Sequence, residues 1–236
     1  MQLFYSKDLD SKSITHTFDK TESRHIVRVL GKKMGDTLEI TNGKNQLFTA
    51  ELLNENERKC NVKIISISTK ETPRKQEVSI AIAPTKSNDR YEWFLEKATE
   101  IGIDNIHPIL CNHSERKVIK QERLSKVIVT AMKQSLQFKL PILHELSRFE
   151  TFINQPFNGD KFIAYCEESK GKTLQSLLKK DTNTLILIGP EGGFSTEEIK
   201  KALETNFIPV SLGNTRLRTE TAGIVAVHTV SLTNQR

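Results

Sequence analysis

Two strand-loop-helix patterns near the C-terminus constrain the fold of this chain more than any other feature. In LILIGPEGGFSTEEI, residues 185–199, an apolar run stops at glycine and a helical pattern follows. VSLGNTRLRTETAGIV, residues 210–225, repeats the plan. Buried parallel strands are continuous apolar runs, and the loops that follow them open at one edge of a sheet. The two patterns therefore predict a ligand site built from glycine-rich backbone.

The first loop, GPEGG at residues 189–193, can adopt backbone angles closed to other residues and leaves its amides uncovered by side chains. Ser195 and Glu198 have capping-box spacing, which predicts a helix from Thr196. The second helix is expected to begin near Thr219 or Glu220. A plain tight turn would also explain GPEGG, but two such loops in succession favour a binding site.

Nucleotide-binding fingerprints are absent from the sequence. There is no G-x-x-x-x-G-K-[ST] and no G-x-G-x-x-G at a strand end. Glu191 would repel a triphosphate, but it suits a ligand that carries positive charge.

The same residues resemble a known family. IGPEGGFSTEEI and SLGNTRLRTETAGIVAV are similar to the two signature loops of the RsmE family, bacterial methyltransferases of the SPOUT superfamily. HIVRVL with GD at residues 35–36, EKATEIG at 96–102, and QS at 134–135 with Pro141 resemble its other motifs. The resemblance covers almost the whole chain, and the two C-terminal loops are its most specific part.

One segment departs from the family pattern. Where the family usually has Glu-Gln-Ser followed by arginine, this chain has Lys133-Gln134-Ser135 and then Gln137 and Lys139. The role of the loop from Lys133 to Lys139 is therefore left open.

The resemblance implies an α/β protein with an N-terminal PUA-like RNA-binding β-barrel and a SPOUT methyltransferase domain. It further implies a deep trefoil knot, which is a rare exception to the rule against threaded chains, and a homodimer. The implied cofactor is S-adenosylmethionine, and we expect a pocket formed largely by backbone groups. The residues expected to bind it are Ile188, Gly189, Pro190, Glu191, Gly192, Gly193, Leu212, Gly213, Asn214, Leu217, Arg218 and Thr219.

The methyl acceptor that the resemblance implies is N3 of a uridine in 16S ribosomal RNA of the small subunit. Protonated N3 is a poor nucleophile, so the site must remove that proton while it positions the nitrogen. We expect Arg218 to stabilise the anionic base and Glu220 to accept the proton. A structural ion pair that closes the loop is the alternative reading of these two residues.

Basic residues predict where RNA binds. One group crowds a short N-terminal stretch, and another follows the first two strands of the predicted sheet, where ligands meet open α/β sheets. The predicted RNA-binding residues are Arg24, His25, Arg28, Lys32, Lys86, Arg90 and Arg116.

Patterning predicts a β-rich domain over residues 1–70 and an α/β domain over 74–236, which the resemblance identifies as the methyltransferase domain. In the first we expect strands at 37–40, 47–52 and 62–67, with a hairpin turn at Asn42-Gly43 and few helices, followed by a linker at 68–76. In the second, strands are expected at 78–83, 105–110, 161–166, 184–188 and 207–212. Helices are expected at 89–101, 121–136, 172–180, 196–204 and 220–232.

Composition agrees with these expectations. The 236 residues carry a net charge of +6, which suits an anionic partner. Cys60, Cys111 and Cys166 lack C-x-x-C spacing and predict buried thiols in a reducing cytosol. The histidines have no ligand-like spacing, so no metal is expected. With no membrane-length apolar run and no signal-peptide pattern, we expect a cytoplasmic protein without a membrane partner.

Two other functions fit the sequence. Another SPOUT enzyme could methylate a ribose 2′-hydroxyl or a tRNA base with similar loops. A non-catalytic ribosome-assembly factor could keep the fold and bind RNA without turnover, although the intact RLRTET stretch argues against lost activity.

Overall fold

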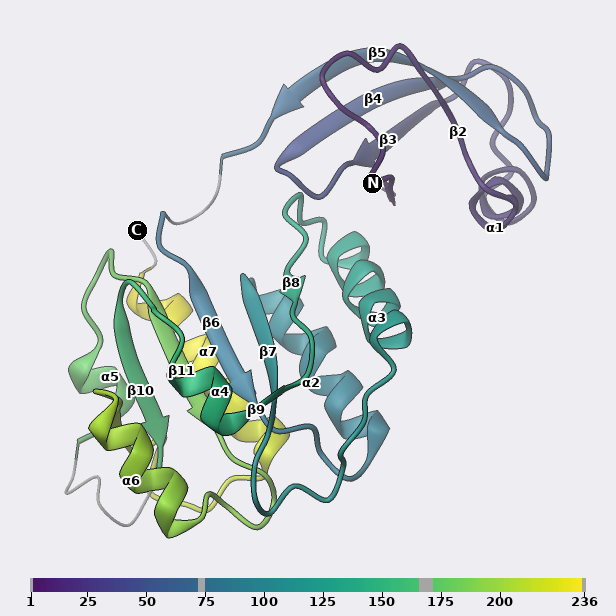
Figure 1. Cartoon of the computed structure of the whole chain (residues 1–236). Helices are drawn as coiled ribbons and strands as arrows, with labels where there is room; N and C mark the ends of the chain where they lie inside the picture. Colours follow the sequence, from purple (N-terminus) through teal and green to yellow (C-terminus); the bar gives the residue numbers. More distant parts are fainter. Residues whose placement is uncertain (1, 72–74, 166–171, 235–236) are drawn as a thin grey trace. The chain divides into compact units, whose positions relative to one another are not determined.

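The computed structural model describes residues 2–71, 75–165 and 172–234 (Figure 1). It divides into two compact units, and the segment Met132–Leu140 is grouped with the N-terminal one. Positions 72–74 of the predicted linker and Cys166 lie outside the described residues.

A five-stranded curled sheet forms the N-terminal unit, with strand order β1-β3-β4-β5-β2. Its strands are β1 Leu3–Tyr5, β2 Thr15–Thr17, β3 Thr37–Thr41, β4 Gln46–Leu52 and β5 Asn61–Thr69. Alternation along β4 places Phe48, Ala50 and Leu52 in the core. The three predicted strands are confirmed, but β5 continues to Thr69, so the first residues assigned to the linker belong to the sheet.

The predicted Asn42-Gly43 turn joins β3 and β4, which pair antiparallel. Gly43 has a φ of 74°, a left-handed angle that favours glycine. The Asn42 side-chain oxygen accepts a 2.9 Å hydrogen bond from the Lys44 backbone N–H, as asparagine does in tight turns.

A short helix that the sequence pattern did not predict follows β2. Helix α1, Lys20–Arg24, continues into a π-helical segment, η1, His25–Val29. The Asp19 carboxylate caps α1 by accepting a 2.8 Å hydrogen bond from the Glu22 N–H. Only Ser23 and Ile26 are buried in these ten positions, so the apolar period was too brief to indicate a helix.

The segment that departs from the family pattern packs within the N-terminal unit. Lys133 Nζ lies 2.6 Å from the Glu22 carboxylate and 5.6 Å from the centre of the Phe4 ring. The Leu140 N–H donates to the Gly43 carbonyl at 2.9 Å. Lysine at position 133 therefore serves an ion pair and a cation–π contact inside this unit.

The second unit contains a parallel sheet of order β12-β10-β11-β6-β7-β8, with β9 also pairing with β7. Its strands are β6 Val78–Ile82, β7 Asn105–Leu110, β8 Ile142–Leu143, β9 Ser147–Arg148, β10 Asp160–Ala164, β11 Thr184–Ile188 and β12 Ile208–Val210. Every pairing in this sheet is parallel. The predicted α/β class and the five predicted strands are confirmed, although the β12 strand is shorter than residues 207–212.

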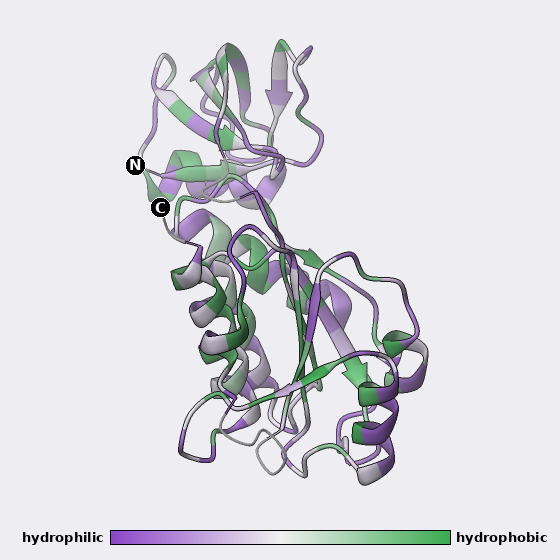
Figure 2. Ribbon diagram, turned by 90° about the vertical axis from the view of Figure 1, so that its left-hand side faces the viewer, coloured by the Kyte–Doolittle hydropathy of each residue, from purple (hydrophilic) through white to green (hydrophobic). Residues whose placement is uncertain are grey.

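Helices cover both faces of this sheet (Figure 2). They are α2 Asn88–Ile101, α3 Gln121–Gln134, α4 Phe149–Ile153, α5 Leu174–Leu177, α6 Thr196–Glu204 and α7 Thr219–Thr233. Ala81 of β6 packs into a core with Phe149 of α4 and Ala202 of α6. The neighbouring residue Ile82 faces α7 on the other side, because successive strand residues point to opposite faces.

One predicted helix of this unit needs correction, and one helix was missed. The helix expected at 172–180 spans only Leu174–Leu177, because Leu178 is extended and Lys179 turns outward to pair with Asp160 at 3.2 Å. Helix α4 was not predicted, and its five residues give too short a periodic pattern. The knot stays a prediction from the resemblance.

Three thiols were predicted to be buried, and the prediction is confirmed for the two that the structure describes. Cys60 and Cys111 are free and buried. Burial raises the pKa of Cys60 to about 11 and raises that of Cys111 further above its usual range. Neither is a reactive thiolate.

Candidate active site

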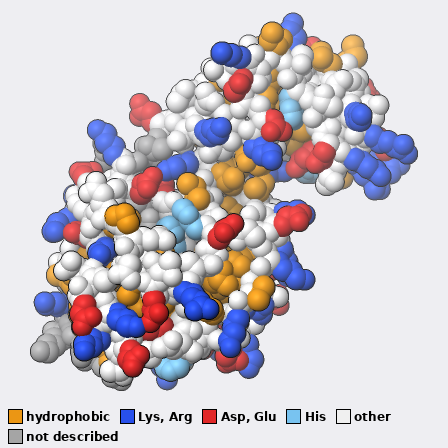
Figure 3. All heavy atoms as spheres, in the orientation of Figure 1, with side chains coloured by type: hydrophobic (Ala, Val, Ile, Leu, Met, Phe, Trp, Pro, Cys, Tyr) orange, Lys and Arg blue, Asp and Glu red, His pale blue; other side chains and the backbone are white. Residues whose placement is uncertain are grey.

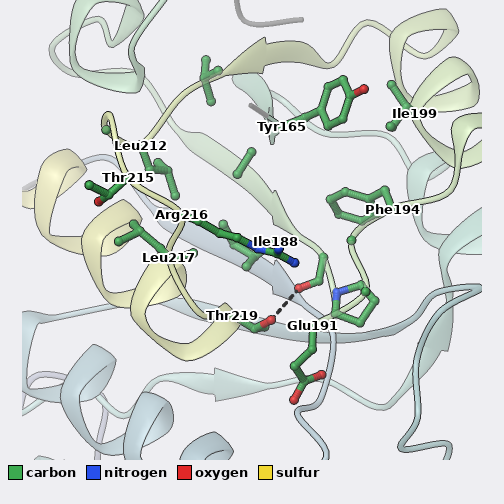
Figure 4. A pocket seen from close by; sticks show the side chains of 18 of the residues that line it. Tyr165, Ile188, Glu191, Phe194, Ile199, Leu212, Thr215, Arg216, Leu217 and Thr219 are labelled. Atoms are coloured by element: carbon green, nitrogen blue, oxygen red, sulfur yellow. Dashed lines mark hydrogen bonds between the residues drawn. The ribbon is translucent and has the colours of Figure 1, made fainter. Parts of the chain in front are cut away.

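A cavity of about 360 Å³ lies where β10, β11 and β12 end (Figure 4). All three strands end at the same edge of the parallel sheet, so the loops that follow them converge. Every residue predicted to bind the cofactor lines this cavity except Asn214 and Arg218. Asn214 is exposed on the loop, and Arg218 lines a neighbouring depression.

Two hydrogen-bonded contacts shape the loops around the cavity. The Thr219 hydroxyl donates to the Gly189 carbonyl at 3.1 Å and so joins the two glycine loops. In the first loop the Gly193 N–H donates to the Pro190 carbonyl at 2.8 Å, and Gly193 has a φ of 75°. Gly213 in the second loop has a φ of 148°, which side chains rarely tolerate.

The predicted capping box at the start of α6 is confirmed and fixes a third loop. Glu198 is only 3% exposed, and its two oxygens accept the N–H groups of Ser195 and Asn112, each at 2.8 Å. A ring nitrogen of His113 lies 3.1 Å from the Gly193 carbonyl oxygen. The loop after β7 is therefore held against the GPEGG loop from outside the cavity.

The Glu191 carboxylate does not face the cavity. Its side chain points away from the enclosed space in Figure 4, and Oε1 accepts a 3.0 Å hydrogen bond from the Lys86 backbone N–H. The placement of this carboxylate beside a positive ligand, which the sequence favoured, is thus revised. Glu191 ties the GPEGG loop to the loop after β6.

Arg116 was predicted to contact RNA, but its guanidinium hydrogen-bonds the loop after β6, which Glu191 also contacts. Nε donates to the Thr85 carbonyl at 2.9 Å, and a terminal amino group donates to the Lys86 carbonyl. Lys86 Nζ itself lies in the open, 2.8 Å from Glu115. Of these two predicted residues, only Lys86 keeps a side chain directed to solvent.

A shallow depression of about 620 Å³ adjoins the cavity between the starts of α2 and α7. Arg216 and Leu217 line both spaces, and in Figure 4 Arg216 reaches across toward the GPEGG loop. The remaining residues of the depression are Asp89, Arg90, Trp93, Arg218, Glu220 and Thr221.

Glu220 is the buried acid of this depression. Its side chain is 7% exposed, and Oε1 lies 3.8 Å from Arg90 Nε. Oε2 is buried and has no hydrogen-bond partner among the described residues. The structure therefore brings the predicted pair Arg218 and Glu220 together beside the cavity, with Arg90 as a further partner that the sequence placed with RNA.

Sequence reasoning missed several residues that line these spaces. Phe194 and Arg216 lie inside the two quoted motifs, so the motifs themselves contained the signal. Tyr165 follows β10, where the sequence has no glycine-rich run, and Trp93 lies on a helix far away in sequence. Nothing in the local sequence marked those two.

The predicted N-terminal RNA residues lie along α1, η1 and the segment that follows them. Arg24 and Arg28 are exposed on α1 and η1, while His25 and Lys32 are half-buried. Arg28 Nε lies 3.1 Å from Glu57. On the face drawn in Figure 3, basic side chains gather near α1.

The described parts of the chain contain no cluster of three or more His, Cys, Asp or Glu residues able to hold a metal ion. Nor, within those parts, is any helix long and apolar enough to cross a membrane.

Comparison with known sequence families defines the class of protein. The profile of the RNA methyltransferase domain matches residues 72–231, and that of the RNA methyltransferase PUA domain matches residues 18–65. The fold and the backbone-lined cavity therefore belong to an RNA methyltransferase with a PUA domain.

Individual relatives narrow this class. The ribosomal RNA small subunit methyltransferase E of Buchnera aphidicola from Schizaphis graminum is 28% identical over 92% of this chain and 87% of its own length. The probable rRNA-methyltransferase of Porphyromonas gingivalis is 39% identical, with a TM-score of 0.90 over 98% of this chain and 99% of that one. A Legionella pneumophila protein, described as a methyltransferase in complex with its bound cofactor SAM, is 26% identical, with a TM-score of 0.88 over 98% and 97%. The chain belongs to the ribosomal RNA small subunit methyltransferase E family.

Proposed function

We propose that this chain transfers a methyl group from S-adenosylmethionine to N3 of a uridine in 16S rRNA of the small ribosomal subunit. Its family membership supports rRNA as the substrate, and the SAM complex of the Legionella relative supports the cofactor. The observation that carries the proposal is the adjacency of two spaces: a glycine-lined cavity and a depression holding the buried acid Glu220.

The cavity residues fit S-adenosylmethionine. The cavity volume of about 360 Å³ lies within the usual range for small-molecule sites. Ile188, Leu212 and Leu217 offer apolar walls for an adenine ring, while the glycine backbone offers donors and acceptors for its edges and for ribose.

The proposed chemistry divides between cofactor and protein. S-adenosylmethionine supplies a methyl carbon whose bond to sulfur breaks, leaving the electron pair on sulfur, as the bond to uridine N3 forms. Glu220 accepts the N3 proton, directly or through water, and later releases it to solvent. Arg218 lies in the same depression and stabilises the negative charge that develops on the uracil carbonyls.

In this proposal the N-terminal unit binds the RNA. Arg24, Arg28 and Lys32 would contact phosphates and so position the RNA without reading its sequence. Lys86 and Arg90 would contact RNA beside the site. A protein that modifies ribosomal subunits works in the cytoplasm, where free thiols such as Cys60 stay reduced.

We further propose that the enzyme is a homodimer through α7. This helix is apolar around most of its circumference: Ala226, Val227 and Val230 are buried, and Leu232 is 50% exposed. A helix that is apolar on every side usually has more than one packing partner. Analytical ultracentrifugation tests the dimer independently of activity.

Transfer of labelled methyl to small ribosomal subunits tests the function. We expect label in 16S rRNA, and nuclease digestion with mass spectrometry should place it on the uracil base rather than on ribose. Label on ribose or on tRNA would favour another SPOUT activity. RNA binding with no transfer by the SAM-loaded protein would favour an assembly factor.

A further inference from the structure

We propose that the depression between α2 and α7 is the binding site of the target uracil, and that Trp93 is the surface on which the ring stacks. This inference rests on the proposed function and adds to it a residue that holds the base. It joins an exposed aromatic side chain, a group of arginines and a buried acid with one oxygen that has no hydrogen-bond partner among the described residues.

Trp93 is placed where a core residue would not be. Its side chain is 43% exposed, whereas Tyr91 and Phe94 on the same helix are buried to 2% and 0%. Trp93 lines the depression together with Arg90 and Arg216. An aromatic face next to guanidinium groups is the usual surface for an unstacked base and its phosphate.

Glu220 supplies the second, independent observation. The residue is 6% exposed, and its buried Oε2 has no hydrogen-bond partner among the described residues. A buried carboxylate oxygen without a donor is costly, so a ligand that brings an N–H into the depression would be favoured. Arg90, 3.8 Å away, compensates the charge without hydrogen-bonding this oxygen.

Uracil matches the groups that line the depression better than cytosine does. It presents an N3–H donor between two carbonyl oxygens, and these would meet the Glu220 carboxylate and the Arg218 guanidinium. Cytosine has an unprotonated N3, which would face the carboxylate lone pairs and be repelled. The depression therefore selects uracil partly by rejecting cytosine.

The position of the depression suits methyl transfer. Arg216 and Leu217 line both the depression and the cofactor cavity, so a single loop separates a base on Trp93 from a cofactor behind it. A base held there would approach the cavity at the end of α7 that carries Glu220.

Trp93 fluorescence tests this assignment directly, because it is the only tryptophan in the chain. The full-length protein is titrated with a short single-stranded RNA that has one central uridine, and with the matched RNA that has cytidine there. We expect the uridine RNA to quench the emission, and the cytidine RNA to need a roughly tenfold or higher concentration. Equal quenching by both, or none, would overturn the proposal.

The same measurement separates base binding from a subunit contact. If a second copy covers the depression, the emission shifts to the blue as the protein is concentrated without RNA, and RNA has no effect. That result would also overturn the proposal, and it would leave the proposed methyl transfer untouched.

Methylation kinetics of the Trp93→Ala and Trp93→Phe variants test whether stacking on Trp93 matters for activity. Stacking on an aromatic side chain predicts a loss of roughly five- to hundredfold in kcat/KM for RNA in the alanine variant, with phenylalanine intermediate. The dissociation constant for S-adenosylmethionine, measured by calorimetry, should not change. Val118→Ala is the control, since Val118 is 73% exposed and lines neither space.

Each kinetic outcome is decisive. If the wild-type protein methylates RNA and Trp93→Ala matches it, the base site lies elsewhere and the proposed function stands. If the wild-type protein binds the cofactor but methylates no RNA, the proposed function fails and this inference falls with it.

Discussion

The Thr219 hydroxyl donates a 3.1 Å hydrogen bond to the Gly189 carbonyl, and this contact joins two loops that are 30 residues apart in sequence. Thr219 is only 5% exposed and is the first residue of α7. The bond therefore fixes the distance between the GPEGG loop and the loop after β12, which form opposite walls of the cavity.

Thr219→Val should weaken cofactor binding. Valine keeps the shape of threonine but leaves the Gly189 carbonyl without its donor, and a hydrogen bond of this kind contributes about 0.5–1.5 kcal/mol. We expect the dissociation constant for S-adenosylmethionine, measured by calorimetry, to rise about two- to tenfold. Thr219→Ser keeps the hydroxyl and should bind nearly as the wild type does. Equal binding by the valine variant would show that the two walls keep their places without this bond.

Much of the second unit could be predicted because its central strands β6 and β11 are fully buried. Residues 185–188 form a continuous apolar run, and the Ser195–Glu198 box marks where α6 begins, so local sequence defines both. Short elements such as α4 were missed because five residues carry almost no periodic signal.

The contacts that individual site residues make were harder to predict than their positions. Glu191 and Arg116 were recognised as part of the site, but their partners are backbone groups of the loop at residues 85–86, which are 105 and 31 positions away, respectively. A contact between distant loops depends on the sheet order, which local patterns do not encode. The exposed aromatic Trp93 was missed for the same reason.

Gly223→Ala should destabilise the second unit, although the same change in an ordinary helix stabilises by about 0.5–1 kcal/mol. A Cβ at position 223 would lie 2.6 Å from Phe94 Cε2 and 3.0 Å from Ile82 Cδ1. Overpacking of a buried contact costs about 1–3 kcal/mol, so the net sign is unfavourable. The free energy of unfolding from urea titration measures it.

Phe94→Leu in the same chain is the matched control for the Gly223 prediction. The smaller side chain opens space for the new methyl group, so the double variant should be more stable than the sum of the two single changes predicts. Strict additivity would contradict a steric clash at this helix crossing.

Stability should fall as the pH drops from about 6.5 toward 4, in part because of a histidine pair. The rings of His107 and His144 stack with centroids 3.9 Å apart. Burial, and then the neighbouring His144, lowers the pKa of His107 to about 4, and burial lowers that of His144. The folded state keeps His107 neutral in a range where the unfolded chain takes up a proton, so acid favours unfolding.

Urea unfolding at pH 7 and at pH 5 measures this effect. One such group contributes at most about 1.4 kcal/mol per pH unit. His107→Gln should flatten the difference between the two pH values. If His107→Gln keeps the full pH dependence, the stacked pair is not its source.

Replacing Arg24, Arg28 and Lys32 together with glutamate should weaken RNA binding and reduce its salt dependence. Each lost phosphate contact reduces the slope of log K against log salt by about 0.7–0.9. Arg28 is already paired with Glu57 at 3.1 Å, so we expect the loss to amount to about two contacts. Fluorescence anisotropy at several salt concentrations gives the slope.

Charge reversal of Lys126 and Lys200 is the control for the RNA-binding experiment. Both residues are exposed, on α3 and α6 of the second unit. This variant should keep the wild-type slope. An unchanged slope in the N-terminal variant would mean that α1 and η1 do not contact the phosphates.

Glu220→Gln should lower kcat far more than it weakens binding of RNA or cofactor. Glu220 is 6% exposed and lies with Arg218 in the depression beside the cavity, so its proposed contact with the N3 proton matters most in the transition state. Loss of a general base costs about a hundred- to ten-thousandfold in rate. Raising the pH should restore part of that loss, because more of the uridine is then already deprotonated.

Two further variants test whether the fall in kcat of Glu220→Gln reflects the methyl-transfer step itself. Arg218→Ala should also act on kcat, because it removes a charge that stabilises the uracil anion, but raising the pH should restore less of its activity. Glu191→Gln is the matched acid-to-amide control: its carboxylate accepts from the Lys86 N–H and points away from the cavity, so kcat should fall much less. If Glu220→Gln turns over near the wild-type rate, or if reduced cofactor affinity accounts for its whole loss, the proton leaves to another group. Glu220 would then be a structural partner of Arg90.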